Sequence, residues 1–161
     1  MKRILLYILV LIALCFAPIK GANIGNLRPV EVVHIYKTQN QVAIATDTGD
    51  FGIGETGLAA LENLKATTPG TIYLDTAAYL LIGQGAEEAV EELRNSLKKR
   101  VKVCAAQEGI DLSLAAEFLP VHGSLPRLKA WDSDLDLPQL KVTEKRLILS
   151  QKTLDNRASI W

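Results

Sequence analysis

The chain has 161 residues, of which 48% are hydrophobic and 22% are charged, and its 18 basic side chains balance its 18 acidic ones. That length predicts one domain with at most a short tail, and the apolar fraction excludes a disordered chain. The zero net charge argues against a nucleic-acid-binding surface, and the two cysteines are too few for a disulfide scaffold or a zinc site.

The first 21 residues have the layout of an export signal. Lys2 and Arg3 precede an unbroken apolar run over residues 4–17, and Pro18 and Lys20 follow it. A helix of that run spans about 21 Å, which is short of a hydrocarbon core of about 30 Å. A cleaved signal is therefore favoured over an uncleaved anchor, and a buried N-terminal helix is a third interpretation. We expect an extracytoplasmic protein, secreted or held at the outer face of the cytoplasmic membrane by this segment.

Cysteine usage and charge change if this segment is removed. Leu14 precedes Cys15, where a lipoprotein signal requires a small residue, so we do not expect lipidation. Cys104 is then the remaining cysteine, and we expect it to be buried and unpaired. Loss of Lys2, Arg3 and Lys20 leaves 15 basic and 18 acidic side chains, a net charge of about −3. That balance does not suggest charge-driven binding to a membrane surface.

Residues 22–125 are predicted to form an α+β domain. β-branched side chains around a polar turn indicate a hairpin, and leucines at helical spacing follow it. The helix over residues 86–100 is the clearest, because glutamates crowd its first half and basic residues its end, which complements the helix dipole. In chain order we expect strands over 30–36 and 42–46, a Gly-rich loop over 47–57, a helix over 58–66, a strand over 71–75, a strand or helical turn over 77–82, the helix over 86–100, a strand over 101–105 and a short helix over 111–119, capped by Asp111 or Ser113.

The composition changes after Pro120. Pro126, Pro138 and three aspartates after Trp131 indicate that residues 126–161 form a loosely held extension, in which residues 145–149 could form a last strand. The order of elements predicts an α+β fold: a mixed sheet of about five or six strands, two main helices, a short third helix and an extended C-terminal tail.

A Gly-rich motif precedes the first predicted helix. Gly52, Gly54 and Gly57 match G-x-G-x-x-G, and Asp75 lies 21 residues after Gly54 at the end of the next predicted strand. In dinucleotide-binding units such glycines let the backbone N–H groups approach the pyrophosphate, and the acidic side chain binds the ribose. Here five residues separate the motif from the preceding strand, that strand belongs to a hairpin, and an exported protein rarely meets a nicotinamide cofactor. A flexible loop with glycines at positive φ is favoured, and a nucleotide or phosphate site is the alternative.

The remaining chemically active residues form no catalytic or metal-binding constellation. His122 lies close to Ser124 without a third group to orient the pair, and His34 alternates with apolar residues as a strand-face residue. Cys104 is interpreted as a buried, inert thiol. Trp131 either caps the core or contacts a partner. We therefore predict no enzyme activity, no cofactor and no metal.

Several short segments carry a family resemblance. They are residues 24–30 (IGNLRPV), 59–64 (AALENL), 72–74 (IYL) and 80–89 (LLIGQGAEEA), followed by a helix, a strand and a short helix up to residue 119. In these segments and their order the chain resembles, over about residues 24–150, the N-terminal domain of the C subunit of bacterial spore germinant receptors, the Ger(x)C-type family.

The resemblance implies a function by binding. It implies an exported, non-enzymatic binding or assembly module, an accessory protein of sporulation or spore germination at the membrane of an endospore-former. Other membrane or germinant-receptor proteins would be its partners, and nucleic acid would not. No site residue carries over from the family, and the small-molecule ligand stays open.

Overall fold

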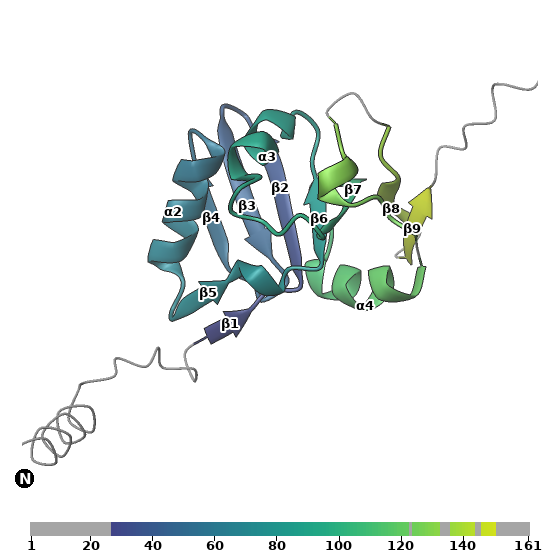
Figure 1. The fold of residues 1–161 in the computed structure, drawn as a ribbon, viewed down its shortest axis with the longest axis horizontal. Helices are drawn as coiled ribbons and strands as arrows, with labels where there is room; N and C mark the ends of the chain where they lie inside the picture. Colours follow the sequence, from purple (N-terminus) through teal and green to yellow (C-terminus); the bar gives the residue numbers. More distant parts are fainter. Residues whose placement is uncertain (1–26, 123, 133–135, 144–145, 151–161) are drawn as a thin grey trace, which may run out of the picture.

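Figure 1 shows the fold of the chain in a computed structural model. The structure describes residues 27–122, 124–132, 136–143 and 146–150. The expected export signal, Cys15 within it, and the end of the chain from residue 151 lie outside these described residues.

The larger of two sheets is mixed and has seven strands, in the order β4-β3-β2-β6-β7-β8-β9. Its strands β2, β6, β7 and β8 run parallel, whereas β3, β4 and β9 pair antiparallel with their neighbours. These strands are β2 (Val32–Thr38), β3 (Gln41–Thr46), β4 (Phe51–Gly54), β6 (Tyr79–Ile82), β7 (Lys102–Ala106), β8 (Gln139–Thr143) and β9 (Arg146–Ser150). β1 (Leu27–Pro29) and β5 (Thr71–Tyr73) form a separate parallel pair. The predicted α+β fold with a mixed sheet is confirmed.

Helices cover both faces of the large sheet. Among the described residues the α-helices are α2 (Gly57–Thr67), α3 (Glu87–Leu93) and α4 (Leu112–His122), and the 3₁₀ turns are η2 (Leu74–Thr76) and η3 (Leu128–Ala130). Residues of α2, α3 and η3 share one buried cluster with the sheet, and residues of α4 share the other. The central strands are therefore buried on both faces, which explains why β6 reads as a continuous apolar run in the sequence.

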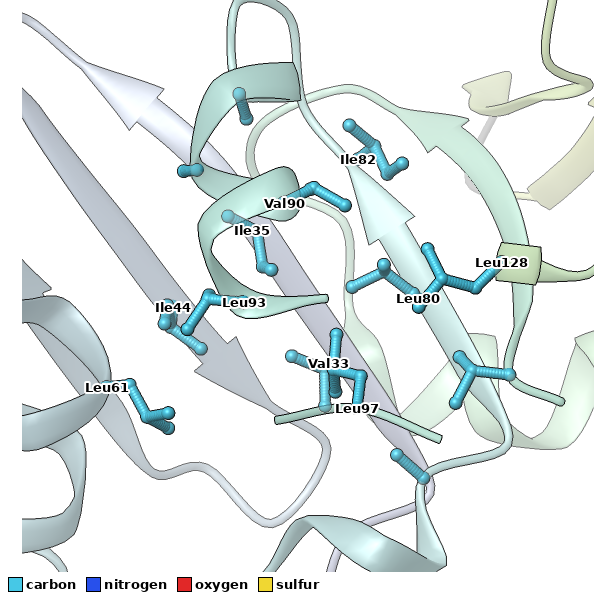
Figure 2. Close-up of a cluster of buried hydrophobic side chains, with 14 of the residues drawn as sticks. Val33, Ile35, Ile44, Leu61, Leu80, Ile82, Val90, Leu93, Leu97 and Leu128 are labelled. Atoms are coloured by element: carbon cyan, nitrogen blue, oxygen red, sulfur yellow. The ribbon is translucent and has the colours of Figure 1, made fainter. Parts of the chain in front are cut away.

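Figure 2 shows the core on the α2 and α3 face. Alternate residues of the strands point into it, among them Val33, Ile35 and Leu80, and they meet Leu61 of α2 and Val90 of α3. Each such side chain contributes about 1.5–3 kcal/mol when it is fully buried. On the other face, the intervening strand residues pack against α4. The alternation of β2 therefore supplies both cores from one strand.

The segment that contains Gly52 and Gly54 is strand β4 and not a loop, which corrects the prediction of a flexible loop there. Neither of these glycines has positive φ. Instead, a Cβ on Gly52 would lie 2.4 Å from the backbone oxygen of Ala60, and one on Gly54 would lie 2.4 Å from the Ala60 nitrogen. The glycines are thus needed because α2 packs directly on the backbone of β4.

Helix α3 is shorter than predicted, because it ends at Leu93 instead of Arg100. The backbone N–H of Arg94 donates to Glu91 O, an i to i+3 bond that tightens the last turn. Asn95 and Ser96 follow, and their side chains compete with helical backbone bonds. The basic residues 98–100 therefore lie in the connection to β7 and do not complement a helix dipole.

The described residues of the predicted extension over 126–161 pair with the rest of the domain, and the possible last strand over residues 145–149 corresponds to β9 (Arg146–Ser150). Residues 126–128 run beside the first half of β7: Val103 N donates to Pro126 O at 2.8 Å, and Leu128 N donates to Val101 O at 2.7 Å. β8 continues along the second half of β7, and β9 closes the sheet. Leu128, Trp131 and Leu140 are buried. The prolines and aspartates between them made the sequence of this region look like an exposed segment.

Candidate functional site

A cleft of about 690 Å³ lies at the carboxyl ends of the parallel strands. Tyr36 and Lys37 from β2, Gln84 from the turn after β6, and Gln107 and Glu108 from the turn after β7 line it. This is the edge at which open sheets with parallel strands bind ligands, because the loops that follow the strands converge there. The opposite wall comes from the last part of the domain, with Trp131, Asp136, Leu137, Gln139 and Lys141.

One glycine allows Tyr36 to reach this position. A Cβ on Gly83 would lie 2.4 Å from the Cβ of Tyr36, so a side chain at residue 83 would displace the tyrosine. The backbone N–H of Gly83 donates to Ile35 O at 2.7 Å and continues the pairing of β2 with β6 past the last residue of β6. The close approach of two backbones therefore places an aromatic ring at the mouth of the cleft.

The cleft has a mixed electrostatic character. Lys37 and Lys141 bring positive charge, and Glu87, Glu108 and Asp136 bring negative charge. Burial raises the pKa of Tyr36, and the negative charge of Glu108 raises this pKa further. Tyr36 therefore stays a neutral hydroxyl, able to donate and to accept a hydrogen bond.

The lining of the cleft offers groups that bind polar molecules. Glutamine amides offer donors and acceptors, and the half-buried Tyr36 offers a ring surface. Among the described residues that line the cleft there is no histidine, cysteine, serine or threonine, whereas lysine, tyrosine and carboxylate side chains are present. This arrangement can hold a polar molecule in place by hydrogen bonds and opposite charges.

His34 lies in β2, two residues before Tyr36, with the ring centroids 4.8 Å apart. Its side chain is 2% exposed, and its Nε2 atom has no hydrogen-bond partner among the described residues. Burial lowers the pKa of His34 to about 4, so the imidazole is neutral at physiological pH. The sequence placed His34 on a strand face, and the structure confirms that position.

The structure separates the residues of the Gly-rich motif from any phosphate-binding arrangement of the expected kind. β4, which carries Gly52 and Gly54, is antiparallel to β3, and a Cβ on Gly57 would lie 2.7 Å from the backbone oxygen of Ala89 in α3. At the start of α2 the N–H of Leu58 already bonds to Glu92 Oε2 at 3.3 Å. A carboxylate therefore occupies the place where the fingerprint would hold pyrophosphate.

Asp75, the expected ribose ligand, lies in η2 and faces Lys98 at 3.9 Å. It is not at the carboxyl end of a strand beside the motif, because the predicted strand over residues 71–75 ends at Tyr73. The sequence therefore matches the dinucleotide-binding pattern, but the fold does not bring the glycines and Asp75 together in one binding site.

The other residues singled out in the sequence have structural roles. His122 ends α4, where its ring stacks on Phe118 with centroids 4.0 Å apart. Cys104 is buried in β7, and burial raises its pKa to about 12, which confirms a buried thiol. Trp131 is 3% exposed, so it caps the core, and its backbone oxygen accepts from Arg94 Nη2 at 2.9 Å.

Sequence reasoning missed Tyr36, Gln84 and Glu108. These residues lie at the ends of apolar strand segments, which is visible in the sequence. That position predicts a ligand site only once it is known which strands are parallel. Within the described part of the chain, no three His, Cys, Asp or Glu side chains are grouped to hold a metal ion, and no helix is long and apolar enough to cross a membrane.

Comparisons with family models, with curated proteins and with solved structures gave no match to this chain.

Proposed function

We propose that the chain is an exported, non-enzymatic binding module, secreted or held at the outer face of the cytoplasmic membrane by its N-terminal segment, and that the cleft at the carboxyl ends of β2, β6 and β7 is its ligand site. The observation that carries the proposal is the composition of that cleft: charges of both signs, amides and the ring of Tyr36 around about 690 Å³. Small-molecule sites have volumes of about 300–1,000 Å³, so the cleft has the size of a ligand site.

The chemistry of the lining favours a small zwitterion, such as an amino acid or a short peptide. Lys37 or Lys141 would pair with its carboxylate, and Glu87 or Glu108 with its ammonium group. The neutral hydroxyl of Tyr36 would bond to a backbone amide of a peptide. A ligand with one sign of charge would leave part of the lining unpaired, which lowers its affinity.

Saturation-transfer NMR with free amino acids and dipeptides tests the ligand site. We expect a saturation-transfer signal for at least one zwitterion in the presence of the wild-type chain. We expect that signal to be lost with the double variant Lys37→Gln, Glu108→Gln. The matched control is Glu62→Gln, Lys65→Gln, which changes the same two charges on the exposed side of α2. Equal signals in both double variants, or no signal from any zwitterion with wild type, would contradict the proposal.

Export is tested separately. The basic and apolar order of residues 1–17 supports it, and a fusion of residues 1–30 to a reporter that is active only after export gives the readout. Activity outside the membrane is expected, and retention in the cytoplasm would refute this part. The proposal extends to an accessory role in sporulation or spore germination, which is supported by the resemblance of residues 24–150 alone.

A further inference from the structure

Six basic residues gather at the amino end of β7, at the opposite end of that strand from the cleft. Two stretches supply them, residues 95–103 and 124–131, and neither stretch contains an acidic residue. We name the group the β7 basic cluster: it consists of Lys98, Lys99, Arg100, Lys102, Arg127 and Lys129.

Backbone contacts hold the two stretches together. Lys102 and Arg127 are directly opposite each other in an antiparallel bridge, so their side chains leave the same side. The N–H of Lys129 donates to the backbone oxygen of Lys99 at 3.3 Å. The cluster is therefore a fixed feature of the fold and not a chance meeting of two loops.

Few members of the cluster form an ion pair with another described residue. Lys98 lies 3.9 Å from Asp75, and Lys102 lies 5.4 Å from the ring centroid of Tyr79. Within the described ranges the other four members form no ion pair within 4 Å, and all four are exposed to solvent. Acidic residues border the cluster at Lys129, which lines a hollow together with Glu91 of α3 and Asp132, whereas the acidic residues of the cleft lie elsewhere.

The chain enters the domain close to the cluster. β1, which begins at Leu27, pairs with β5, and β5 leads into η2, where Asp75 faces Lys98. Figure 1 shows β1 and β5 together at the lower edge of the domain. Only nine residues, 18–26, separate Leu27 from the apolar segment over residues 4–17, and they span at most about 30 Å.

We propose that the β7 basic cluster docks the domain on the anionic phospholipid headgroups of the membrane that the N-terminal segment enters. This inference depends on the proposed export and on the second interpretation of the N-terminal segment, an anchor that is not cleaved. The short connection keeps the cluster near the bilayer, and cationic side chains near an anionic surface each strengthen binding about fivefold. Docking by this end turns the cleft, at the other end of the parallel strands, away from the bilayer.

Lysine footprinting of the full chain tests the proposal. The chain is mixed with vesicles of phosphatidylcholine alone, or with vesicles that contain about one-third phosphatidylglycerol, and is labelled with an amine-reactive reagent read by mass spectrometry. We expect the anionic vesicles to protect Lys98, Lys99 and Lys129, and to leave Lys37 and Lys65 unchanged. The protection is lost at about 1 M salt, where the Debye length is about 3 Å.

A charge variant gives the affinity. We expect Lys99→Gln, Arg100→Gln, Arg127→Gln to bind anionic vesicles roughly 100-fold more weakly than wild type, from a fivefold loss for each charge. The matched control, Lys37→Gln, Lys65→Gln, Lys141→Gln, removes three charges elsewhere and keeps the protection of the cluster.

Three outcomes would overturn the proposal. Equal protection by neutral vesicles would show that charge does not direct the contact, and no protection by either vesicle would show that the domain does not dock. Equal protection by inorganic phosphate or by a short RNA without vesicles would identify a general polyanion site. Failure of the export reporter would refute the placement of the chain while leaving the vesicle result unchanged, so the two failures are distinguishable.

Discussion

The buried imidazole of His34 predicts that the domain loses stability in mild acid. The ring is neutral in the folded chain, because burial lowers its pKa to about 4, whereas an unfolded chain has the ordinary value of 6.5. Between pH 6.5 and about 4, His34 therefore binds a proton in the unfolded state but not in the folded state. The stability contribution is present at neutral pH and is lost as the pH falls from 6.5 towards 4.

The magnitude follows from the two pKa values. The free energy of unfolding should fall by about 2 kcal/mol between about pH 7 and about pH 5, and by about 3 kcal/mol once the pH is well below 4. A loss of this size is a large fraction of the stability of an ordinary domain, about 5–15 kcal/mol. His34 lies beside Tyr36, which is neutral across this range, so no neighbouring ring on this strand compensates the new charge.

Urea unfolding followed by the fluorescence of buried Trp131 measures this loss. His34→Leu fills a similar volume without a titrating group, so its unfolding free energy should fall about 2 kcal/mol less than that of wild type between about pH 7 and about pH 5. NMR gives an independent readout through the imidazole signal of His34, assigned with a His122→Gln variant. A His34 signal that titrates near the ordinary pKa, or parallel pH profiles for wild type and His34→Leu, would refute the reasoning.

Three further predictions follow from the packing. Gly54→Ala should lower the free energy of unfolding, measured in urea, by about 1–3 kcal/mol, because the new Cβ would lie 2.4 Å from the backbone nitrogen of Ala60. Gly49→Ala, at a residue with φ +81° and open space around it, should lower it by only about 1 kcal/mol. Equal losses in the two variants would contradict the packing argument. In a Cys15→Ser background, Cys104 should react with a thiol reagent at neutral pH only after unfolding, because burial raises its pKa to about 12, and rapid labelling of the folded chain would disprove this. Arg28→Ala should lower the free energy of unfolding by about 1–3 kcal/mol, because it removes the guanidinium 2.7 Å from the buried carboxylate of Asp50 and leaves the Thr48 hydroxyl to donate to it, while Arg100→Ala, exposed and without an ion pair among the described residues, should change it by less than about 0.5 kcal/mol.

Local patterns predicted the elements whose causes are local. The alternation of β-branched residues around Asn40 predicted the β2 and β3 hairpin, and Asp111 was a candidate cap for α4. In the structure the Asp111 carboxylate accepts from the N–H groups of Ser113 and Leu114 at 3.0 and 3.2 Å. Both features are decided within a few residues of the chain.

Features decided by distant contacts were not predictable in the same way. Phe51 to Gly54 has the composition of a loop, and it forms a strand because it pairs with β3, while its glycines let α2 pack directly on its backbone. The cleft required knowledge that β2, β6 and β7 are parallel neighbours, which no pattern in the chain states. The β7 basic cluster required Arg127 to lie opposite Lys102, a pairing across 25 positions.

The pairing of β7 has a consequence for how the chain matures. The outer edge of β7 is completed by residues 126–128 and by β8, which come from the last third of the sequence. In a chain that is synthesised and translocated from its amino end, this edge of β7 would therefore stay unpaired until residues 126–143 have also been translocated. Such an open edge is a template for pairing with other chains. The domain would depend on holding factors during passage, and shortening the chain at residue 125 would yield aggregates instead of a smaller domain.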